Sequence, residues 1–184
     1  MLKYLGYLIQ IILSPSRGWD DVALSKLTLH EALVNGFYPL LGVASCTVFV
    51  QGFYDSVLTL PVLIENAVIM FVSYFISYFL ASFLFAVFGG RLVNGVLDEK
   101  RYNMFIVFNL SILVLIAMLR NCLPMSLSLV EFLPVFVLLA MWMGHRYLDV
   151  EEGKAWQFTL FCGLSVLTPP FLLEFLFKLL LPDN

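Results

Sequence analysis

The chain has 184 residues, of which 61% are hydrophobic and only 12% are charged, and its formal net charge is -3. Soluble domains are about half apolar and about a quarter charged, so this chain cannot cover itself with polar surface in water. The small net charge, spread over the connections between apolar runs, excludes a nucleic-acid-binding protein and an acidic tail. The composition predicts an all-α polytopic membrane protein, a helical bundle with lipids among its partners.

The first predicted element is an amphipathic region over residues 1–31. Its first part places apolar side chains at helical spacing, in a stretch too short to span a bilayer, at Leu2, Leu5, Ile9 and Ile12. A turn over residues 14–18 leads into a second amphipathic helix over residues 19–30. We expect both helices to lie at the cytoplasmic membrane surface, either as a specific lipid site or simply packed over the inner mouth of the bundle.

Five apolar segments follow and form a single transmembrane domain over residues 32–181. The predicted crossings are about 32–53, 61–88, 102–119, 127–147 and 155–181. Each is near the roughly 20 residues that cross a hydrocarbon core of about 30 Å. Gly36 and Pro39 should kink the first crossing, and Pro169 and Pro170 should break the fifth midway.

Basic residues predict the orientation, because Lys and Arg resist translocation more than acidic residues do. Eight of them flank one side, namely Lys3, Arg17, Lys26, Arg91, Lys100, Arg101, Arg146 and Lys154. The other side has only Arg120 and Lys178. The N-terminus is therefore predicted in the cytoplasm and the C-terminus outside. The three tryptophans agree, because Trp19, Trp142 and Trp156 fall at predicted cytoplasmic ends, where indole rings prefer the headgroup layer.

The sequence has no complete catalytic or metal-binding pattern. His30 and Glu31 begin like the zinc-protease helix motif, but Val34 stands where the second histidine is required. Ser165 with His145 as its base resembles an intramembrane serine protease only by chance, since no residue is evident that would orient the base. We therefore expect neither enzyme activity nor a cofactor.

Charged residues near the predicted outer helix ends form the first candidate site, namely Glu65, Arg120, Glu131 and Glu174. A charge in a membrane is costly and is usually paired. The four either form a polar vestibule for a headgroup or solute, or reach separately into water. Arg120 is expected beside a carboxylate, with Glu131 the first candidate and Glu174 the second. On the inner side the same two interpretations apply to His30, Glu31, His145 and Arg146.

Small residues recur at every fourth position of the second crossing. One set is Ser73, Ser77 and Ala81, and the other is Ser82, Ala86 and Gly90. Such ridges let a second helix approach closely. The contact they predict is either within the monomer or across a dimer.

Two short motifs accompany the five segments and the cytoplasmic N-terminus. Pro15 and Trp19 stand in Leu13-Ser14-Pro15-Ser16-Arg17-Gly18-Trp19, and Gly89 and Gly90 stand in Phe88-Gly89-Gly90-Arg91 at the end of the second crossing. Together these features resemble the Yip family of membrane proteins, the Ypt/Rab-interacting proteins and their bacterial relatives. The resemblance covers essentially the whole chain.

The resemblance implies a non-catalytic integral membrane organising or interaction protein, whose partners are lipids and other membrane proteins or a second copy of the chain. Eukaryotic members are associated with Rab GTPases and usually have a longer polar N-terminal region. That region is short here and lacks their Asp-Leu-Tyr-Gly-Pro element, which argues against GTPase binding. The short form is similar to the bacterial relatives, which implies an inner-membrane location with a periplasmic C-terminus.

The alternative function is a small transporter or a lipid-handling protein that flips lipids. It is motivated by the proline-interrupted fifth crossing and the polar helix ends, since discontinuous helices can expose backbone groups to a substrate.

Overall fold

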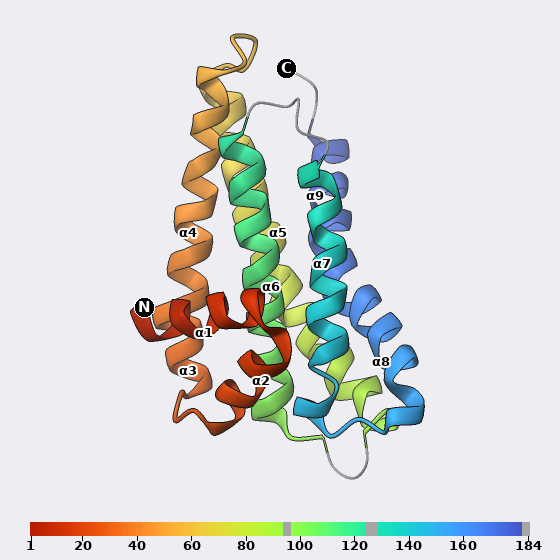
Figure 1. The fold of residues 1–184 in the computed structure, drawn as a ribbon. Helices are drawn as coiled ribbons and strands as arrows, with labels where there is room; N and C mark the ends of the chain where they lie inside the picture. Colours follow the sequence, from red (N-terminus) through yellow and green to blue (C-terminus); the bar gives the residue numbers. More distant parts are fainter. Residues whose placement is uncertain (94–96, 124–128, 182–184) are drawn as a thin grey trace.

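The computed structural model describes residues 1–93, 97–123 and 129–181, without the side chains of residues 129–131. Within these ranges the chain is helical and forms no β-strand, which confirms the predicted all-α class. The α-helices are α1 (Leu2–Leu13), α2 (Pro15–Leu24), α3 (Leu29–Ala32), α4 (Tyr38–Cys46), α5 (Leu60–Phe88), α6 (Glu99–Cys122), α7 (Leu129–Met143), α8 (Ala155–Cys162) and α9 (Thr168–Leu180) (Figure 1). Short 3-10 turns are Thr47–Phe53, Gly89–Arg91, Arg146–Leu148 and Glu152–Lys154.

Two π-helical turns, Leu33–Phe37 and Gly163–Leu167, join α3 to α4 and α8 to α9. A proline ring clashes with the carbonyl four residues earlier, and for Pro39 that residue is Asn35, inside the first π turn. Pro169 stands in the same relation to the second. Because a π turn widens the helix, each rod continues past its proline. The predicted break in the fifth crossing is therefore a π turn.

Four helical segments are long and apolar enough to cross a membrane: Leu29–Phe53, Leu60–Arg91, Glu99–Cys122 and Glu152–Leu180. They coincide with the first, second, third and fifth predicted crossings. The predicted fourth crossing contains α7, which has 15 residues and would be about 22 Å long. Among the described residues, length and composition thus support four spans, one fewer than the sequence predicts.

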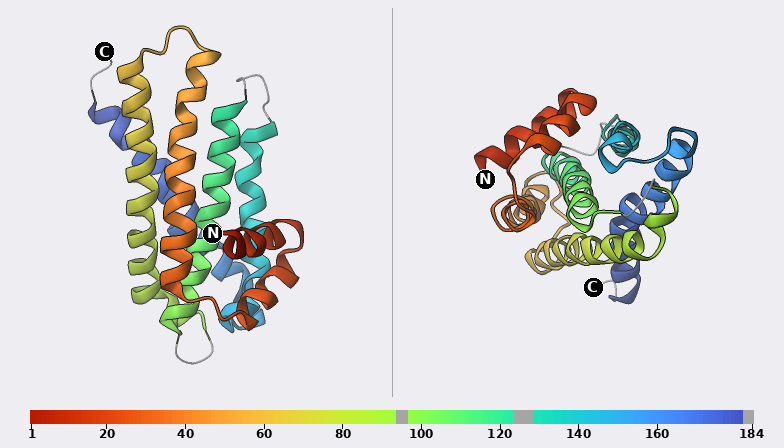
Figure 2. Two further views of the ribbon diagram at one scale, coloured as in Figure 1. Left: turned by 90° about the vertical axis from the view of Figure 1, so that its left-hand side faces the viewer. Right: turned by 90° about the horizontal axis from the view of Figure 1, so that it is seen from below.

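The central helix is α6, and the other long helices surround it when the molecule is seen from below (Figure 2). Every residue from Tyr102 to Val114 is buried. A helix that is apolar on nearly all sides belongs in a core. The few polar side chains here bond to carbonyls of their own helix, and Asn103 and Ser111 also bond to neighbouring helices. The Asn109 side chain donates to the Phe105 carbonyl at 2.8 Å, for example. The axis of the bundle is therefore filled by side chains.

Helix α1 lies across the middle of α6. The Tyr4 hydroxyl makes a 2.5 Å hydrogen bond with Ser111, and its ring stacks on Phe108 at 4.8 Å between centroids. Gly36 leaves room for this ring, because a Cβ there would lie 2.5 Å from it. Ser111 is about 18 Å along α6 from Glu99, at about 1.5 Å of rise per residue. Buried partners on α6 thus hold α1 against the side of the bundle, and its position at the membrane surface stays a prediction.

Candidate functional site

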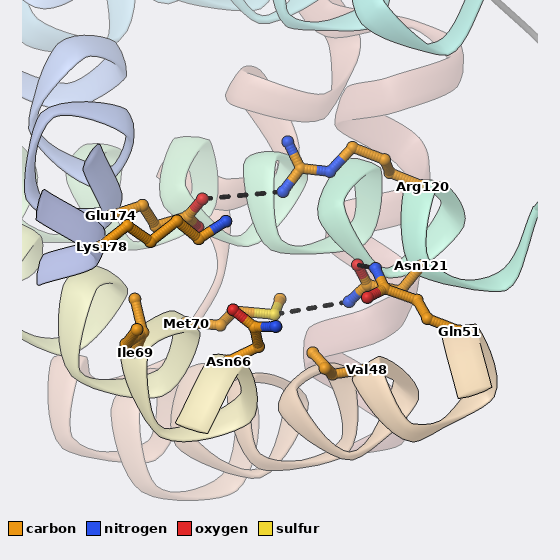
Figure 3. A pocket seen from close by; sticks show the side chains of 9 residues that line it. All are labelled: Val48, Gln51, Asn66, Ile69, Met70, Arg120, Asn121, Glu174 and Lys178. Atoms are coloured by element: carbon orange, nitrogen blue, oxygen red, sulfur yellow. Dashed lines mark hydrogen bonds and ion pairs between the residues drawn. The ribbon is translucent and has the colours of Figure 1, made fainter. Parts of the chain in front are cut away.

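Arg120 and Glu174 form an ion pair at the end of the bundle where α6 stops, which we name the Cys122 end. Nη2 of Arg120 on α6 lies 3.7 Å from Oε2 of Glu174 on α9 (Figure 3). The Glu174 side chain is only 14% exposed, whereas that of Arg120 is 46% exposed. Partial burial limits screening by water, but the long contact keeps the contribution modest.

Asn121, the next residue, makes hydrogen bonds to two other elements. Its side-chain oxygen accepts from Nε2 of Gln51 at 2.9 Å, and its nitrogen donates to Oγ1 of Thr47 at 3.2 Å. The same nitrogen lies 3.6 Å from the sulfur of Met70 on α5. Because Asn121 is buried, its amide needs these partners. They hold the 3-10 turn Thr47–Phe53 against α6.

These groups line a cavity of about 70 Å³ between α5, α6, α9 and the 3-10 turn (Figure 3). Its lining is Val48, Gln51, Asn66, Ile69, Met70, Arg120, Asn121, Glu174 and Lys178. The two cations outnumber the single carboxylate, so the cavity has a positive excess. It is large enough for several water molecules or a small anionic group. We call it the polar cavity.

A second cavity, of about 260 Å³, shares Arg120 with the polar cavity. Its other walls are Tyr74, Leu113, Ile116, Ala117, Pro134 and Phe171. The Tyr74 hydroxyl is directed to the Leu113 carbonyl at 3.5 Å. Arg120 thus stands between a polar cavity and one whose walls are mostly hydrocarbon.

The structure brings together two members of the predicted charged cluster. Arg120 contacts Glu174, the partner that the sequence ranked second. Glu65 is half-buried on α5 and does not line the polar cavity. The side chain of Glu131 lies outside the described residues, so nothing follows for the partner ranked first.

Sequence reasoning missed four polar residues of the cavity, namely Gln51, Asn66, Asn121 and Lys178. Lys178 follows Glu174 by one helical turn, so the spacing alone could have placed the two on one face of α9. Asn66 directly follows Glu65, and only the charged residue of the two was predicted to belong to the site. Gln51 had no local signal, because only the tertiary structure sets it beside Asn121.

The predicted small-residue ridges of α5 have a buried and an exposed part. Buried throughout are Ser73, Ser77 and Ala81. In the second set, the half-buried Ser82 donates to the Asn103 side chain of α6 at 2.7 Å. Ala86 and Gly90 are exposed. The first ridge therefore packs inside the monomer, and the second leaves two small residues at the surface.

Trp19 lies in an aromatic cluster inside the bundle, which corrects its expected role as an interfacial anchor. The residue is 2% exposed, and its ring stacks on Phe105 and Tyr147 at 5.0 and 5.2 Å. Its indole nitrogen donates to the Ala140 carbonyl of α7 at 2.9 Å, and this bond allows full burial. Pro15 is the first residue of α2, where its missing N–H needs no partner.

The glycine pair closes α5 at the opposite end of the bundle, which we name the Glu99 end. A Cβ added at the buried Gly89 would lie 2.7 Å from a methyl group of Leu97, whereas one at Gly90 would meet nothing within 4 Å. Gly89 thus permits close packing against Leu97. The motif with Pro15 and Trp19 and the motif with Gly89 and Gly90 therefore both have structural roles.

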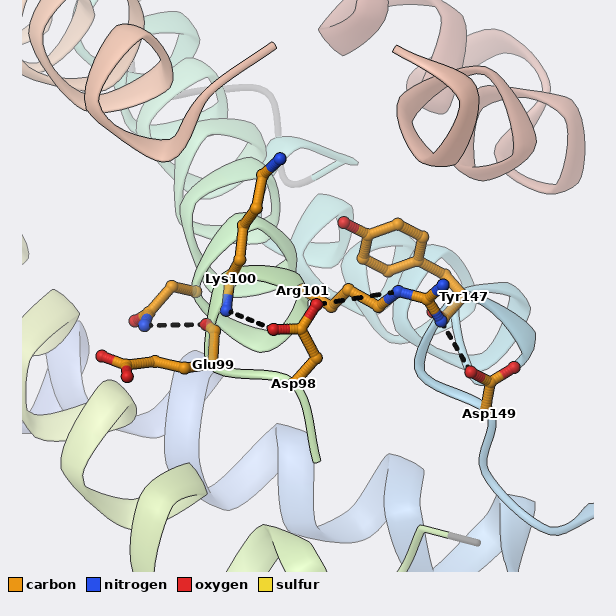
Figure 4. Close-up of polar contacts among 7 residues, drawn as sticks. Asp98, Glu99, Lys100, Arg101, Tyr147 and Asp149 are labelled. Atoms are coloured by element: carbon orange, nitrogen blue, oxygen red, sulfur yellow. Dashed lines mark hydrogen bonds and ion pairs between the residues drawn. The ribbon is translucent and has the colours of Figure 1, made fainter. Parts of the chain in front are cut away.

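Charged groups at the Glu99 end tie the turn after α7 to the start of α6 (Figure 4). Nη1 of Arg101 lies 2.6 Å from Oδ2 of Asp149 and 3.5 Å from the Tyr147 carbonyl. Asp98 caps α6 by accepting from the Lys100 amide at 3.1 Å. Burial raises the pKa of Tyr147 to about 12, against the opposing effect of the Arg101 charge, so the phenol stays neutral.

The inner set predicted from sequence was His30, Glu31, His145 and Arg146. Glu31 forms a capping box with Thr28 at the start of α3. Nδ1 of His145 bonds to the Trp142 carbonyl at 2.6 Å. Both residues thus have local partners within their own segments.

Comparison of the chain with protein-family models, with curated proteins and with solved structures gives no match in any of the three. In the described part of the chain, no three His, Cys, Asp or Glu side chains are grouped so that they could hold a metal ion. The features of this chain that bear on function are therefore the packing of α6 and the polar cavity. That cavity offers positive charge and amide groups, which suit binding of an anionic group.

Proposed function

We propose that the protein is a non-catalytic integral membrane protein that organises or binds other components of its membrane, as the resemblance to the Yip family implies. The observation that carries the proposal is the enclosure of α6, whose residues are all buried from Tyr102 to Val114. Transporters place their substrate sites near the membrane midplane, between moving halves. Here the middle of the bundle is occupied by packed side chains.

The proposed topology has five crossings, with α7 as the fourth. Helix α7 runs beside α6 along the bundle (Figure 1). Most basic residues follow or precede crossings at the Glu99 end, which supports a cytoplasmic Glu99 end and a periplasmic C-terminus in a bacterial inner membrane. A reporter active only in the cytoplasm should work when inserted near Glu99 and fail when fused after Asp55. The reverse result would overturn this orientation.

Lipid handling is the second candidate, favoured by cavities on two sides of α7. Besides the cavity that contains Arg120, an apolar cavity of about 330 Å³ lies between α1, α6 and α7, with Ile12, Leu115, Met118, Leu133 and Phe136 among its walls. Hydrocarbon walls beside a guanidinium match the two parts of a phospholipid.

Reconstitution separates the two functions. Purified protein in liposomes should leave lipid flipping and solute uptake at the rates of empty vesicles if it is an organising protein. Acceleration that Arg120→Ala abolishes, while Arg101→Ala at the opposite end retains it, would replace the organising function with lipid handling. Fluorescence transfer between labelled copies in the same vesicles measures self-association directly.

A further inference from the structure

Helices α1 and α2 form a hairpin that connects the middle of α6 with its Glu99 end. At one end Tyr4 bonds to Ser111, and the Gln10 amide donates to Asp21 between the two helices. Helix α2 then contacts α6 nearer its Glu99 end, where the ring of Trp19 stacks on Phe105. If α6 crosses the membrane as proposed above, this hairpin lies within the leaflet at the Glu99 end. It extends from that end to about half of the length of α6.

The hairpin and α3 border an open concavity of about 730 Å³. Lys3, Gly6 and Gln10 line it from α1, Lys26 from the connection after α2, and Glu31 from α3. Its volume is in the range of about 300–1,000 Å³ that holds small-molecule groups. We call it the hairpin concavity.

Both carboxylates near the hairpin concavity already have neutral partners. Glu31 accepts from the Thr28 backbone at 3.0 Å and from its hydroxyl at 2.9 Å, and Asp21 accepts from Gln10. Among the described residues, the ion pairs do not include Lys3 or Lys26. Two ammonium groups and the single carboxylate of Glu31 thus line the concavity, which leaves it with a positive excess, and neither lysine lies at ion-pair distance from Glu31. Within a membrane such charges require an anion or water.

Exposed leucines also mark the hairpin. Leu24, which lines the concavity, is 84% exposed, and Leu2 and Leu13 at the two ends of α1 are 87% and 79% exposed. We propose that the concavity binds an anionic phospholipid of the leaflet at the Glu99 end. Its phosphate lies between Lys3 and Lys26, and its acyl chains cover the exposed leucines of the hairpin. The inference rests on the proposed membrane placement.

The test is binding of phosphatidylglycerol and of phosphatidylcholine to the full chain in a neutral detergent, followed by native mass spectrometry. Phosphatidylglycerol should bind more tightly. Each lysine beside an anionic lipid contributes a similar part of the binding free energy. The double variant Lys3→Gln, Lys26→Gln should therefore weaken phosphatidylglycerol binding roughly 30-fold. Lys100→Gln, an exposed lysine at the same end but outside the concavity, should leave binding unchanged.

A second variant tests the volume without changing charge. A Cβ at Gly6 meets nothing within 4 Å, and Gly6 lines the concavity, so Gly6→Leu should place its side chain there and also favour the helix. It should weaken phosphatidylglycerol binding several-fold while thermal stability is kept. Equal binding of the two lipids, an equal loss in Lys100→Gln, or full competition by inorganic phosphate would each overturn the proposal. The reporter fusions test membrane placement separately, so the two failures are distinguishable.

Discussion

The two ends of α6 hold their charged side chains in different ways. At the Glu99 end, Arg101 lies 2.6 Å from Asp149, but the two side chains are 46% and 68% exposed. At the Cys122 end, Arg120 lies 3.7 Å from Glu174, which is only 14% exposed and stands near the buried Asn121. The shorter contact is thus the wetter one. Since screening by water weakens exposed pairs, burial should outweigh distance in deciding which pair matters.

Uncharged contacts differ in kind rather than in exposure, because Trp19 and Asn121 are both buried. The Glu99 half is held by stacked rings around Trp19, and the Cys122 end by the hydrogen bonds of Asn121. Aromatic packing depends on buried area, whereas an amide network depends on satisfied polar groups. The effects of four tests, two on single residues and two on ion pairs, should therefore rank in a fixed order.

Trp19→Ala should have the largest effect, a loss of about 3–5 kcal/mol of stability, because it opens a cavity and leaves the Ala140 carbonyl without the indole donor. Thermal unfolding in detergent measures it. Trp156→Ala, at a residue 55% exposed, should cost much less. Equal losses would mean that the aromatic cluster does not hold the Glu99 half.

Asn121→Leu should follow, with a loss of about 1–3 kcal/mol, because Gln51 and Thr47 lose a buried partner. The matched control is Asn66→Leu, which changes the same cavity outside this set of hydrogen bonds. The same unfolding assay should show a clear difference between them. A greater loss for the control would place the key contact elsewhere in the polar cavity.

Arg120→Ala and Glu174→Ala should each lower the unfolding temperature, and the double variant should lower it by less than the sum. The coupling expected for a partly buried pair is about 1 kcal/mol. Lys178, one turn from Glu174, should soften the loss of Arg120 because it lines the same cavity. Strict additivity would show that the two charges do not interact.

The smallest effect should come from the exposed pair. Asp149 has a positive φ of 54°, so Asp149→Asn removes the charge while keeping a residue that tolerates this backbone. Its coupling with Arg101→Ala should stay below about 0.5 kcal/mol and vanish in high salt. A coupling larger than that of Arg120 with Glu174 would reverse the ranking of the two ends.

Much of the fold could be predicted because it follows from local patterns. Apolar runs located the four long spans, and the prolines marked where π turns interrupt two of the α-helical segments. The pairing of Arg120 with a carboxylate could be anticipated, because a charge at a membrane helix end favours a partner. The choice of Glu174 could not, since it depends on how α9 packs beside α6.

The sequence by itself determined an all-helical, strongly apolar chain, because hydropathy and helical period are properties of neighbouring residues. Only the tertiary structure decided that α6 is central, that Trp19 is buried and that α1 lies beside Ser111. An amphipathic pattern predicts that one face of a helix is buried, but it does not predict which residues cover that face. The covering surfaces here are the ring of Phe108, the carbonyl of Ala140 and the space left by Gly36, and each comes from a distant part of the chain.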